Sequence, residues 1–310
     1  NKKINGSKIH KDDIEFLLKE AKKELTLNDR NQSIIHIFNY NYIVDGKTFV
    51  EEPIEVYANL LTHEMTFVTT QKNNLKNIKQ TFINCDIEIE RFISRTFSLG
   101  VRLLNNKELK FGSSLINLDF EKISLGLFKN LALVHSTTFP IGVNHIIKDI
   151  SKVCSLNLKE SKNIVDNIDF SFKSNQSIFD ENNYLKNIYF LDSNFRKISK
   201  DLILSVIKAR LDEIVSLLNK NLIAPGFNLN SGVNYVLKKS SNLFNIEGYF
   251  IDFFRPNLKK IEKNNIEKDF EACLGAIEII KDGWETEAIP EKSVKASEKI
   301  GFFSRIFKFN

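Results

Sequence analysis

The sequence predicts an α/β protein in which helices pack against a mixed β-sheet. Segments with strand-like composition alternate along the chain with segments whose apolar residues recur at helical spacing. A meander of three predicted strands also precedes one of the helices. With 310 residues, of which 42% are hydrophobic and 27% charged, the chain is long enough for two domain-sized cores and has the composition of a globular protein.

The first third of the chain predicts a helix, a group of strands and two further helices. Apolar residues at helical spacing run from Ile14 to Leu25, directly after two aspartates that favour a helix start. The segments with strand-like composition are 33–37, 40–44, 55–61 and 65–70. A turn is expected at Asp45-Gly46, between the second and third of them. A helix around Ile78 and a second, more apolar helix over residues 92–104 follow.

The middle of the chain predicts the meander and two strong helices. The three strands are expected at 111–118, 123–128 and 131–137. Lys129-Asn130 joins the last two, a length that suits a tight hairpin. A helix follows Gly142, and residues 200–222 form the second, long amphipathic helix. Between these helices, residues 161–194 are polar and weakly patterned, which indicates a small inserted lobe.

The last part of the chain predicts short elements, a linker and a tail. The short elements are a strand at 227–229, a helix from Val233, a strand at 249–253 and a helix at 267–280. Residues 282–298 are polar and contain Pro290, so we expect a flexible linker there.

The sequence after the linker becomes apolar again, with a basic flank. On a helical wheel the aromatic and aliphatic residues share one face, which predicts a helix lying in a membrane interface with its cations toward anionic head groups. The residues expected to bind the membrane are Lys299, Ile300, Phe302, Phe303, Arg305, Ile306, Phe307 and Lys308. The alternative is a terminal helix docked on its own domain.

Composition excludes several classes of protein. The net charge of +5 is mild for this length and gives no reason to expect a nucleic-acid partner. Cys85, Cys154 and Cys273 are far apart and lack ligand spacing, which argues against disulfides and structural zinc and favours a reducing compartment. No apolar run is long enough to span a bilayer, and no signal peptide follows Asn1, which we interpret as the cut end of a longer chain.

Several segments occur in an order that resembles one protein family. They are His36-Ile37, Tyr42–Gly46 with Pro53, Thr66–Thr69, the helix through Asn77 and Cys85, Leu131–Gly142 with His145 and Asp149, Ser199–Ile214, and the Phe-rich basic tail. Together they resemble the FtsA family, the actin-like proteins that hold the bacterial division ring to the membrane. The stretch Leu131–Gly142, which ends in Pro-Ile-Gly before a helix, resembles the family most closely.

The resemblance implies a two-lobed actin-like (ribonuclease H-like) fold with the family's extra subdomain and a C-terminal amphipathic helix. It assigns residues 1–70 to part of the extra subdomain, 71–106 to a remnant of the first-lobe core, 107–158 to the second-lobe core, 159–222 to a small upper subdomain with the long helix, 223–283 to the return to the second-lobe core and the closing helix, 284–298 to the linker, and 299–310 to the membrane-targeting helix. The family's first phosphate-binding hairpin would precede residue 1.

The resemblance also implies where a nucleotide would bind. The family's second phosphate hairpin reads approximately Asp-x-Gly-Gly-Gly-Thr-Thr-Asp, whereas residues 117–124 here contain no glycine and begin with Asn117. Glycine is needed there because a Cβ keeps the backbone away from the anion. The degenerate nucleotide-site residues are Asn117, Asp119, Lys122, Ser231 and Gly232. We therefore expect no cofactor, no metal and no catalytic residue, and ATP with Mg²⁺ only if a missing N-terminal part restores the site.

The remaining expectations concern partners. In the family, the lobe that carries the long helix binds the C-terminal peptide of FtsZ, the tubulin-like ring protein, and arginines of that lobe contribute. Arg196 and Arg210 fall on matching positions, and the alternative is that both are solvated charges of the helix surface. The implied function is a non-enzymatic tether of the FtsZ ring to the cytoplasmic face of the bacterial inner membrane, which also self-associates and binds other division proteins. The alternatives are an active ATPase of the same family and a related actin-like adaptor from pilus assembly.

Overall fold

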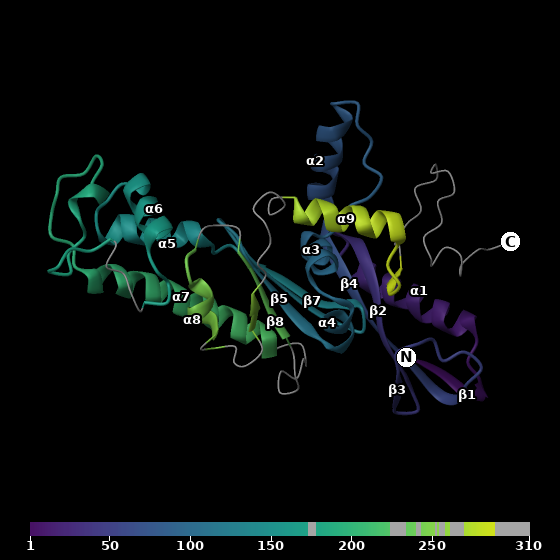
Figure 1. The fold of residues 1–310 in the computed structure, drawn as a ribbon. Helices are drawn as coiled ribbons and strands as arrows, with labels where there is room; N and C mark the ends of the chain where they lie inside the picture. The colour runs from purple at the N-terminus through teal and green to yellow at the C-terminus, as the bar shows by residue number, and fades with distance from the viewer. Residues whose placement is uncertain are drawn as a thin grey trace. The chain divides into compact units, whose positions relative to one another are not determined.

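A computed structural model describes residues 1–172, 178–223, 234–239, 243–251, 253, 258–260 and 270–288 (Figure 1). The chain forms two compact units. Unit 1 contains residues 1–112 and 127–135 and the described residues from 270 onward, and unit 2 contains residues 113–126 and the described residues from 136 to 260.

Unit 1 is built on an antiparallel sheet. Its strands are β1 (Lys2–Lys8), β2 (Gln32–Val44), β3 (Lys47–Phe49), β4 (Tyr57–Gln71) and β10 (Glu287–Ala288). They lie in the order β1-β4-β2-β10, with β3 paired to β2. Two pairs of predicted strands are each one long strand, β2 and β4. The register between them shifts at Ile34/His36 and at Asn39/Asn41, and such bulges interrupt the alternating pattern in the sequence.

A helix closes one hydrophobic core of this sheet. α1 (Lys11–Asn28) begins with a capping box, in which the N–H of His10 donates to Asp13 Oδ2 at 2.7 Å. Its Ile14 and Leu17 are buried against apolar residues of the strands, namely Ile4, Tyr42, Val44, Ala58 and Leu61. The predicted helix is confirmed. β1 was not predicted, because its lysines and glycine obscure a strand pattern.

The predicted turn at Asp45-Gly46 is also confirmed. Both residues have positive φ, 47° and 84°, as a two-residue hairpin turn requires. The carboxylate of Asp45 accepts hydrogen bonds from the N–H groups of Asn59 and Leu60, which ties the β2–β3 hairpin to β4.

Four helices complete unit 1: α2 (Lys72–Ile83), α3 (Arg95–Leu103), α4 (Asn106–Phe111) and α9 (Glu271–Asp282). α3 packs closely on α9. The approach is close enough that a Cβ added to Gly275 would lie 2.1 Å from the carbonyl oxygen of Ser98. α9 belongs to unit 1. The short α4 was not predicted, although Asn105 and Glu108 form a capping box at its start.

The second sheet contains β5 (Ser113–Leu118), β6 (Ile123–Lys129), β7 (Ala132–Phe139), β8 (Asn234–Lys239) and β9 (Leu258–Lys260), in the order β7-β6-β5-β8-β9. β8 runs parallel to both β5 and β9. The predicted three-strand meander is thus confirmed. Its second turn lies one residue later than expected, because Asn130 and Leu131 have the positive φ values, 51° and 59°.

The helices of unit 2 are α5 (Val143–Val153), α6 (Leu158–Asn167), the 3₁₀ turn Asn187–Tyr189, α7 (Lys200–Ile223) and α8 (Ile246–Ile251). α5 and α7 confirm the two strong helical patterns. α6 was missed inside the polar stretch 161–194.

Two elements near the end of unit 2 were predicted wrongly. The helix expected from Val233 is the strand β8, and the strand expected at 249–253 overlaps the helix α8. Short apolar runs fit either type of element, so periodicity could not decide between them. The strand expected at 227–229 lies outside the described residues.

The start of the predicted linker 284–298 is wrong as well. Trp284 Nε1 and Thr286 Oγ1 both donate to the carbonyl oxygen of Leu131, at 2.6 and 2.7 Å, and β10 then pairs with β2. Glu287, 3% exposed, lies 2.5 Å from Nδ1 of the buried His36. These residues are therefore part of unit 1.

The rest of the linker and the predicted membrane-binding tail lie outside the described residues. Among the helices of the described part, none combines the length and apolar character needed to cross a membrane.

Candidate functional site

The β5–β6 hairpin is the first candidate site, because it corresponds to the degenerate phosphate hairpin. All six residues of β5 are buried, and Asn117 is 1% exposed. Asn117 Nδ2 donates to Asp119 Oδ2 at 2.9 Å and lies 3.5 Å from Ser124 Oγ. The hairpin is closed by a hydrogen bond from the N–H of Asp119 to the carbonyl oxygen of Lys122. The interior of the hairpin is therefore filled by its own polar side chains.

The start of α5 lies directly against this hairpin. A Cβ on Gly142 would be 2.5–2.6 Å from backbone atoms of Phe120, Asp119 and Lys122, which explains the glycine at this position. The N–H of Val143 donates to the carbonyl oxygen of Asp119, and the N–H of Asn144 donates to that of Phe120. The backbone N–H groups that could bind an anion at a helix start are thus engaged by the hairpin.

The side chains at the hairpin tip also disfavour a phosphate. Glu121 is exposed and accepts a hydrogen bond from Asn144 Nδ2 at 2.7 Å, and Phe120 is 42% exposed. Lys122, the predicted cationic residue, is exposed. This hairpin offers a carboxylate and an aromatic ring where a phosphate would require free N–H groups, so its residues do not fit ATP.

The other predicted nucleotide residues, Ser231 and Gly232, lie outside the described residues. The parallel register nevertheless identifies residues that sequence reasoning missed. β8 begins with Asn234 opposite Ser113 and ends with Lys238 and Lys239 opposite Asn117 and Leu118. Ligands of open α/β sheets bind at the carboxyl ends of strands, so these two lysines lie at the relevant edge. The mistaken helix from Val233 concealed this signal.

Arg196 and Arg210, the predicted FtsZ contacts, both bind to α5 or to the residues just after it. Arg210 makes a bidentate pair with Asp149, with Nε–Oδ2 at 2.7 Å and Nη2–Oδ1 at 3.0 Å, and it also pairs with Glu213. The hydrogen bond to Asp149 raises the pKa of the Arg210 guanidinium. Arg196 Nη2 donates to the carbonyl oxygen of Ser155 at 2.6 Å. Both side chains are half-buried and hydrogen-bonded within unit 2.

Exposed apolar side chains lie close to Arg196 in the sequence. Ile188, Leu191 and Phe195 are 69%, 59% and 56% exposed, and the Arg196 guanidinium lies 5.9 Å from the ring centre of Phe190. Apolar groups beside cations are suited to a peptide that carries both apolar and acidic residues. These apolar residues were not predicted as a site, because the surrounding sequence is polar and weakly patterned.

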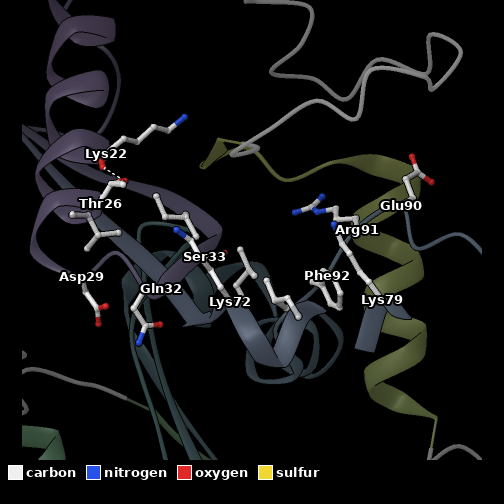
Figure 2. A pocket seen from close by; sticks show the side chains of 14 residues that line it. Lys22, Thr26, Asp29, Gln32, Ser33, Lys72, Lys79, Glu90, Arg91 and Phe92 are labelled. Carbon is white, nitrogen blue, oxygen red and sulfur yellow. Dashed lines mark hydrogen bonds between the residues drawn. The ribbon is translucent and has the colours of Figure 1, made fainter. Parts of the chain in front are cut away.

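Unit 1 contains a hollow of about 430 Å³ that no sequence motif indicated (Figure 2). It lies among the end of α1, the start of β2, α2 and residues 90–92, which are distant in the sequence. Its lining mixes apolar, basic and acidic side chains, including Leu25, Ile34, Lys72, Leu75, Lys79, Arg91, Phe92, Asp29 and Glu90.

The cations of this hollow have partners within unit 1. Lys72 Nζ donates to the carbonyl oxygen of Arg30 at 2.6 Å, and Lys79 Nζ lies 5.8 Å from the ring centre of Phe92. Arg91 pairs with the carboxylate of Glu287. The neighbouring α2 has no buried residue and exposes Ile78 and Phe82. The described part of the chain contains no cluster of side chains that could hold a metal ion.

Most of the first sheet matches a known domain model. Residues 1–69 match the model of the SHS2 domain inserted in FtsA, and this match ends within β4. A cell division protein FtsA from Buchnera aphidicola subsp. Schizaphis graminum is 25% identical over 223 residues, which cover 71% of this chain and 51% of that protein. The chain spans about half the length of the curated relatives it matches first. The resemblance found in the sequence is confirmed.

Solved structures support the fold. A chain of the PilM–PilN type IV pilus biogenesis complex is similar with a TM-score of 0.54 and 11% identity, covering 88% of this chain and 74% of that chain. MreB5 of Spiroplasma citri bound to ADP is similar with a TM-score of 0.50 and 16% identity, covering 68% and 65%. The α/β, actin-like fold class with the extra subdomain is confirmed, and the C-terminal amphipathic helix stays a prediction.

Proposed function

We propose that this chain, a relative of the cell-division protein FtsA, tethers the FtsZ ring to the cytoplasmic face of the bacterial inner membrane at the division site. The observation that supports this most is the match of residues 1–69 to the SHS2 domain inserted in FtsA, followed by FtsA similarity over most of the chain. The tether needs two binding surfaces, one for the ring protein and one for the membrane, and it acts as an adaptor with no catalytic step of its own.

The proposed membrane surface is the tail. Burying one Phe or Ile side chain contributes about 1.5–3 kcal/mol, and each cation near an anionic surface about 1 kcal/mol. After partial burial and ordering costs, a single tail binds weakly and reversibly. Self-association of the chain into an actin-like polymer would place several tails on one membrane, and this raises the effective concentration of each tail. Other division proteins would then assemble on the polymer.

The role we propose does not depend on nucleotide. The support is the β5–β6 hairpin, whose carbonyl groups accept the N–H groups of Val143 and Asn144 and whose interior is filled by Asn117 and Asp119. Binding of ATP with Mg²⁺ is lost or weak in this arrangement. The active ATPase is therefore the less supported alternative. The pilus-assembly adaptor shares the fold, whereas the curated relatives found by sequence are named FtsA.

The proposed surface for FtsZ lies before and along α7. Leu191 and Phe195 supply apolar contacts, and Arg196 supplies positive potential toward acidic residues of the FtsZ C-terminal peptide. Arg210, whose charge is balanced by Asp149 and Glu213, holds α7 to α5 and so positions this surface.

Binding of a fluorescent FtsZ C-terminal peptide, measured by anisotropy, tests this function. Phe195→Asp should weaken binding at least tenfold and leave the melting temperature unchanged, since the side chain is 56% exposed. Phe111→Asp, a change of a 79% exposed phenylalanine in unit 1, is the matched control and should bind as the wild type does. Equal affinity for the wild type and Phe195→Asp would refute the proposed surface, and no binding by the wild type would refute the tether.

A further inference from the structure

One glutamate fastens the last described residues to the first sheet. Glu287 of β10 is 3% exposed, and its carboxylate lies 2.5 Å from Nδ1 of His36 on β2, which is 0% exposed. The N–H of Ser94, the residue before α3, donates to Nε2 of the same ring at 2.7 Å. Because Nε2 accepts this hydrogen bond, the ring proton lies on Nδ1, and His36 donates a hydrogen bond to Glu287. The imidazole therefore connects β2 with both β10 and the start of α3.

Arg91 completes this contact. Its guanidinium pairs with the Glu287 carboxylate and supplies the positive charge that a buried carboxylate needs. The side chains of His36 and Glu287 are buried, whereas that of Arg91 is 20% exposed and lines the hollow of unit 1 (Figure 2). Solvent therefore reaches the contact at Arg91.

The strand that this contact holds is short and is bounded by residues that interrupt regular structure. β10 is two residues long, and they pair with Phe38 and Ile37 of β2. Gly283, with a φ of 74°, separates this segment from α9. Pro290, which has no N–H group to donate to a ladder, follows two residues after β10. Strands of globular proteins usually have five or six residues, so roughly two residues of ladder hold a segment weakly by themselves.

We propose that residues 283–288 form a releasable strap and that the paired charge of Glu287 holds it on the sheet. Trp284 Nε1 and Thr286 Oγ1 donate to one carbonyl oxygen, that of Leu131, so these two contacts form and break together. Loss of the charge on Glu287 or on Arg91 leaves the other charge without its partner. The short ladder and the shared carbonyl group must then hold the strap alone, and the strap leaves the sheet more often.

Release of the strap would lengthen the connection to the predicted membrane-binding tail. This consequence rests on the proposed function, whereas the strap itself does not. With β10 on the sheet, residues 289–298 separate unit 1 from Lys299. Release back to Gly283 adds residues 284–288, which span at most about 16–18 Å when fully extended. A change at Arg91, on the side of the hollow, would in this way alter how far the tail can reach.

Hydrogen exchange of two backbone amides in the full chain tests the strap. The N–H of Asn39 donates to the carbonyl oxygen of Thr286, so its exchange rate reports whether the strap is attached. The N–H of Asp45 donates to the carbonyl oxygen of Leu60, so its exchange rate reports the stability of the sheet itself. Opening confined to the strap changes the first rate and leaves the second unchanged.

Three variants make the test specific. Glu287→Gln keeps the shape of the side chain and removes its charge, so Asn39 should exchange at least tenfold faster than in the wild type while Asp45 is unaffected. Arg91→Gln removes the charge from the other partner and should have the same effect. Glu285→Gln alters an exposed carboxylate of the strap and is the matched control, so it should leave both rates unchanged.

Each possible result decides for or against the strap. A wild-type exchange rate at Asn39 in Glu287→Gln would show that this charge does not hold the segment. Equal acceleration at Asn39 and Asp45 would show that Glu287 supports the whole of unit 1, and the segment is then no releasable strap. If Glu287→Gln does not fold, Arg91→Gln decides in the same way, and failure of both to fold overturns the proposal. Neither FtsZ nor lipid enters these measurements, so their outcome is independent of the division role.

Discussion

At the residue scale, Glu160 at the start of α6 is a carboxylate that accepts five hydrogen bonds. Its Oε1 accepts the N–H groups of Leu191, Asp192 and Ser193 at 2.7–2.9 Å, and its Oε2 accepts the Ser193 hydroxyl and the N–H of Asn157. Burial would raise the pKa of Glu160, but these hydrogen bonds hold it at about 2. The side chain thus anchors the segment that carries Leu191 and Phe195 to unit 2.

The depressed pKa of Glu160 predicts a specific acid sensitivity. The carboxylate is ionised in the folded state down to about pH 2, whereas the unfolded chain takes up this proton near pH 4.5. Its contribution, on the order of 2–3 kcal/mol, is therefore complete above pH 4.5 and is lost as the pH falls toward 2. Glu160→Gln should lower the free energy of unfolding at pH 7 by about 1–3 kcal/mol and flatten its pH dependence between pH 4.5 and 2.5.

Urea unfolding at a series of pH values checks this prediction. Glu181→Gln removes an exposed carboxylate from the same unit and should behave as the wild type does. An equal pH dependence for the wild type and Glu160→Gln would show that the hydrogen bonds to Glu160 do not stabilise its charge. The spacing Asn157-x-x-Glu160 is a capping-box pattern and could have been found in the sequence, whereas the three N–H groups from residues 191–193 could not, because they come from a distant loop.

At the element scale, the hairpin of β5–β6 and the start of α5 form one compact structure that depends on a single glycine. Added atoms at Gly142 would meet backbone, which cannot move aside as a flexible side chain can. Gly142→Ala should therefore lower the melting temperature by several degrees, since overpacking costs about 1–3 kcal/mol. The matched control is Gly248→Ala in α8, where the nearest atom would be Ser171 Cβ at 3.5 Å.

Differential scanning calorimetry distinguishes these two variants. Gly248→Ala should be neutral or slightly stabilising, because alanine favours a helix interior by about 1 kcal/mol over glycine. If Gly142→Ala melts with the wild type, the close approach of the hairpin to α5 is not present in solution, and the argument that the hairpin occupies the helix N–H groups fails.

The elements that the sequence predicted correctly are those whose pattern is long or locally determined. α1, α5 and α7 have sustained helical periodicity, and Asp45-Gly46 has the backbone preferences of a hairpin turn. The wrong assignments at β8 and α8 involve six residues each, too few for periodicity to separate a strand from a helix.

At the scale of the whole molecule, the family resemblance predicted more than any local pattern did. The extra subdomain and the actin-like fold are confirmed, although relatives are only 19–25% identical and no single motif is diagnostic. The attachment of residues 284–288 to β2 was not predictable, because it depends on contacts of Trp284 with Leu131 and of Glu287 with His36 across more than 150 residues. Residues 284–298 are polar and contain few apolar residues, so the sequence alone indicated a linker.

The pairing of β10 with β2 also determines from which part of the chain the predicted membrane-binding tail continues. The last described residues are fixed to the edge of the first sheet, so the predicted tail continues from unit 1 after only about ten further residues. We expect the rest of the linker to set how far the tail can reach from that edge.

Recruitment of FtsZ to vesicles tests the tether most directly. Liposomes containing anionic lipids are mixed with FtsZ and with either the wild-type chain or the Phe303→Glu/Phe307→Glu variant, and the FtsZ that sediments with the vesicles is measured. The wild type should bring down FtsZ equally with and without ATP and Mg²⁺, and the variant should leave FtsZ near the background without this chain, because its two charges lie on the apolar face of the tail. Recruitment by the variant equal to that of the wild type, or recruitment only with ATP, would contradict the account.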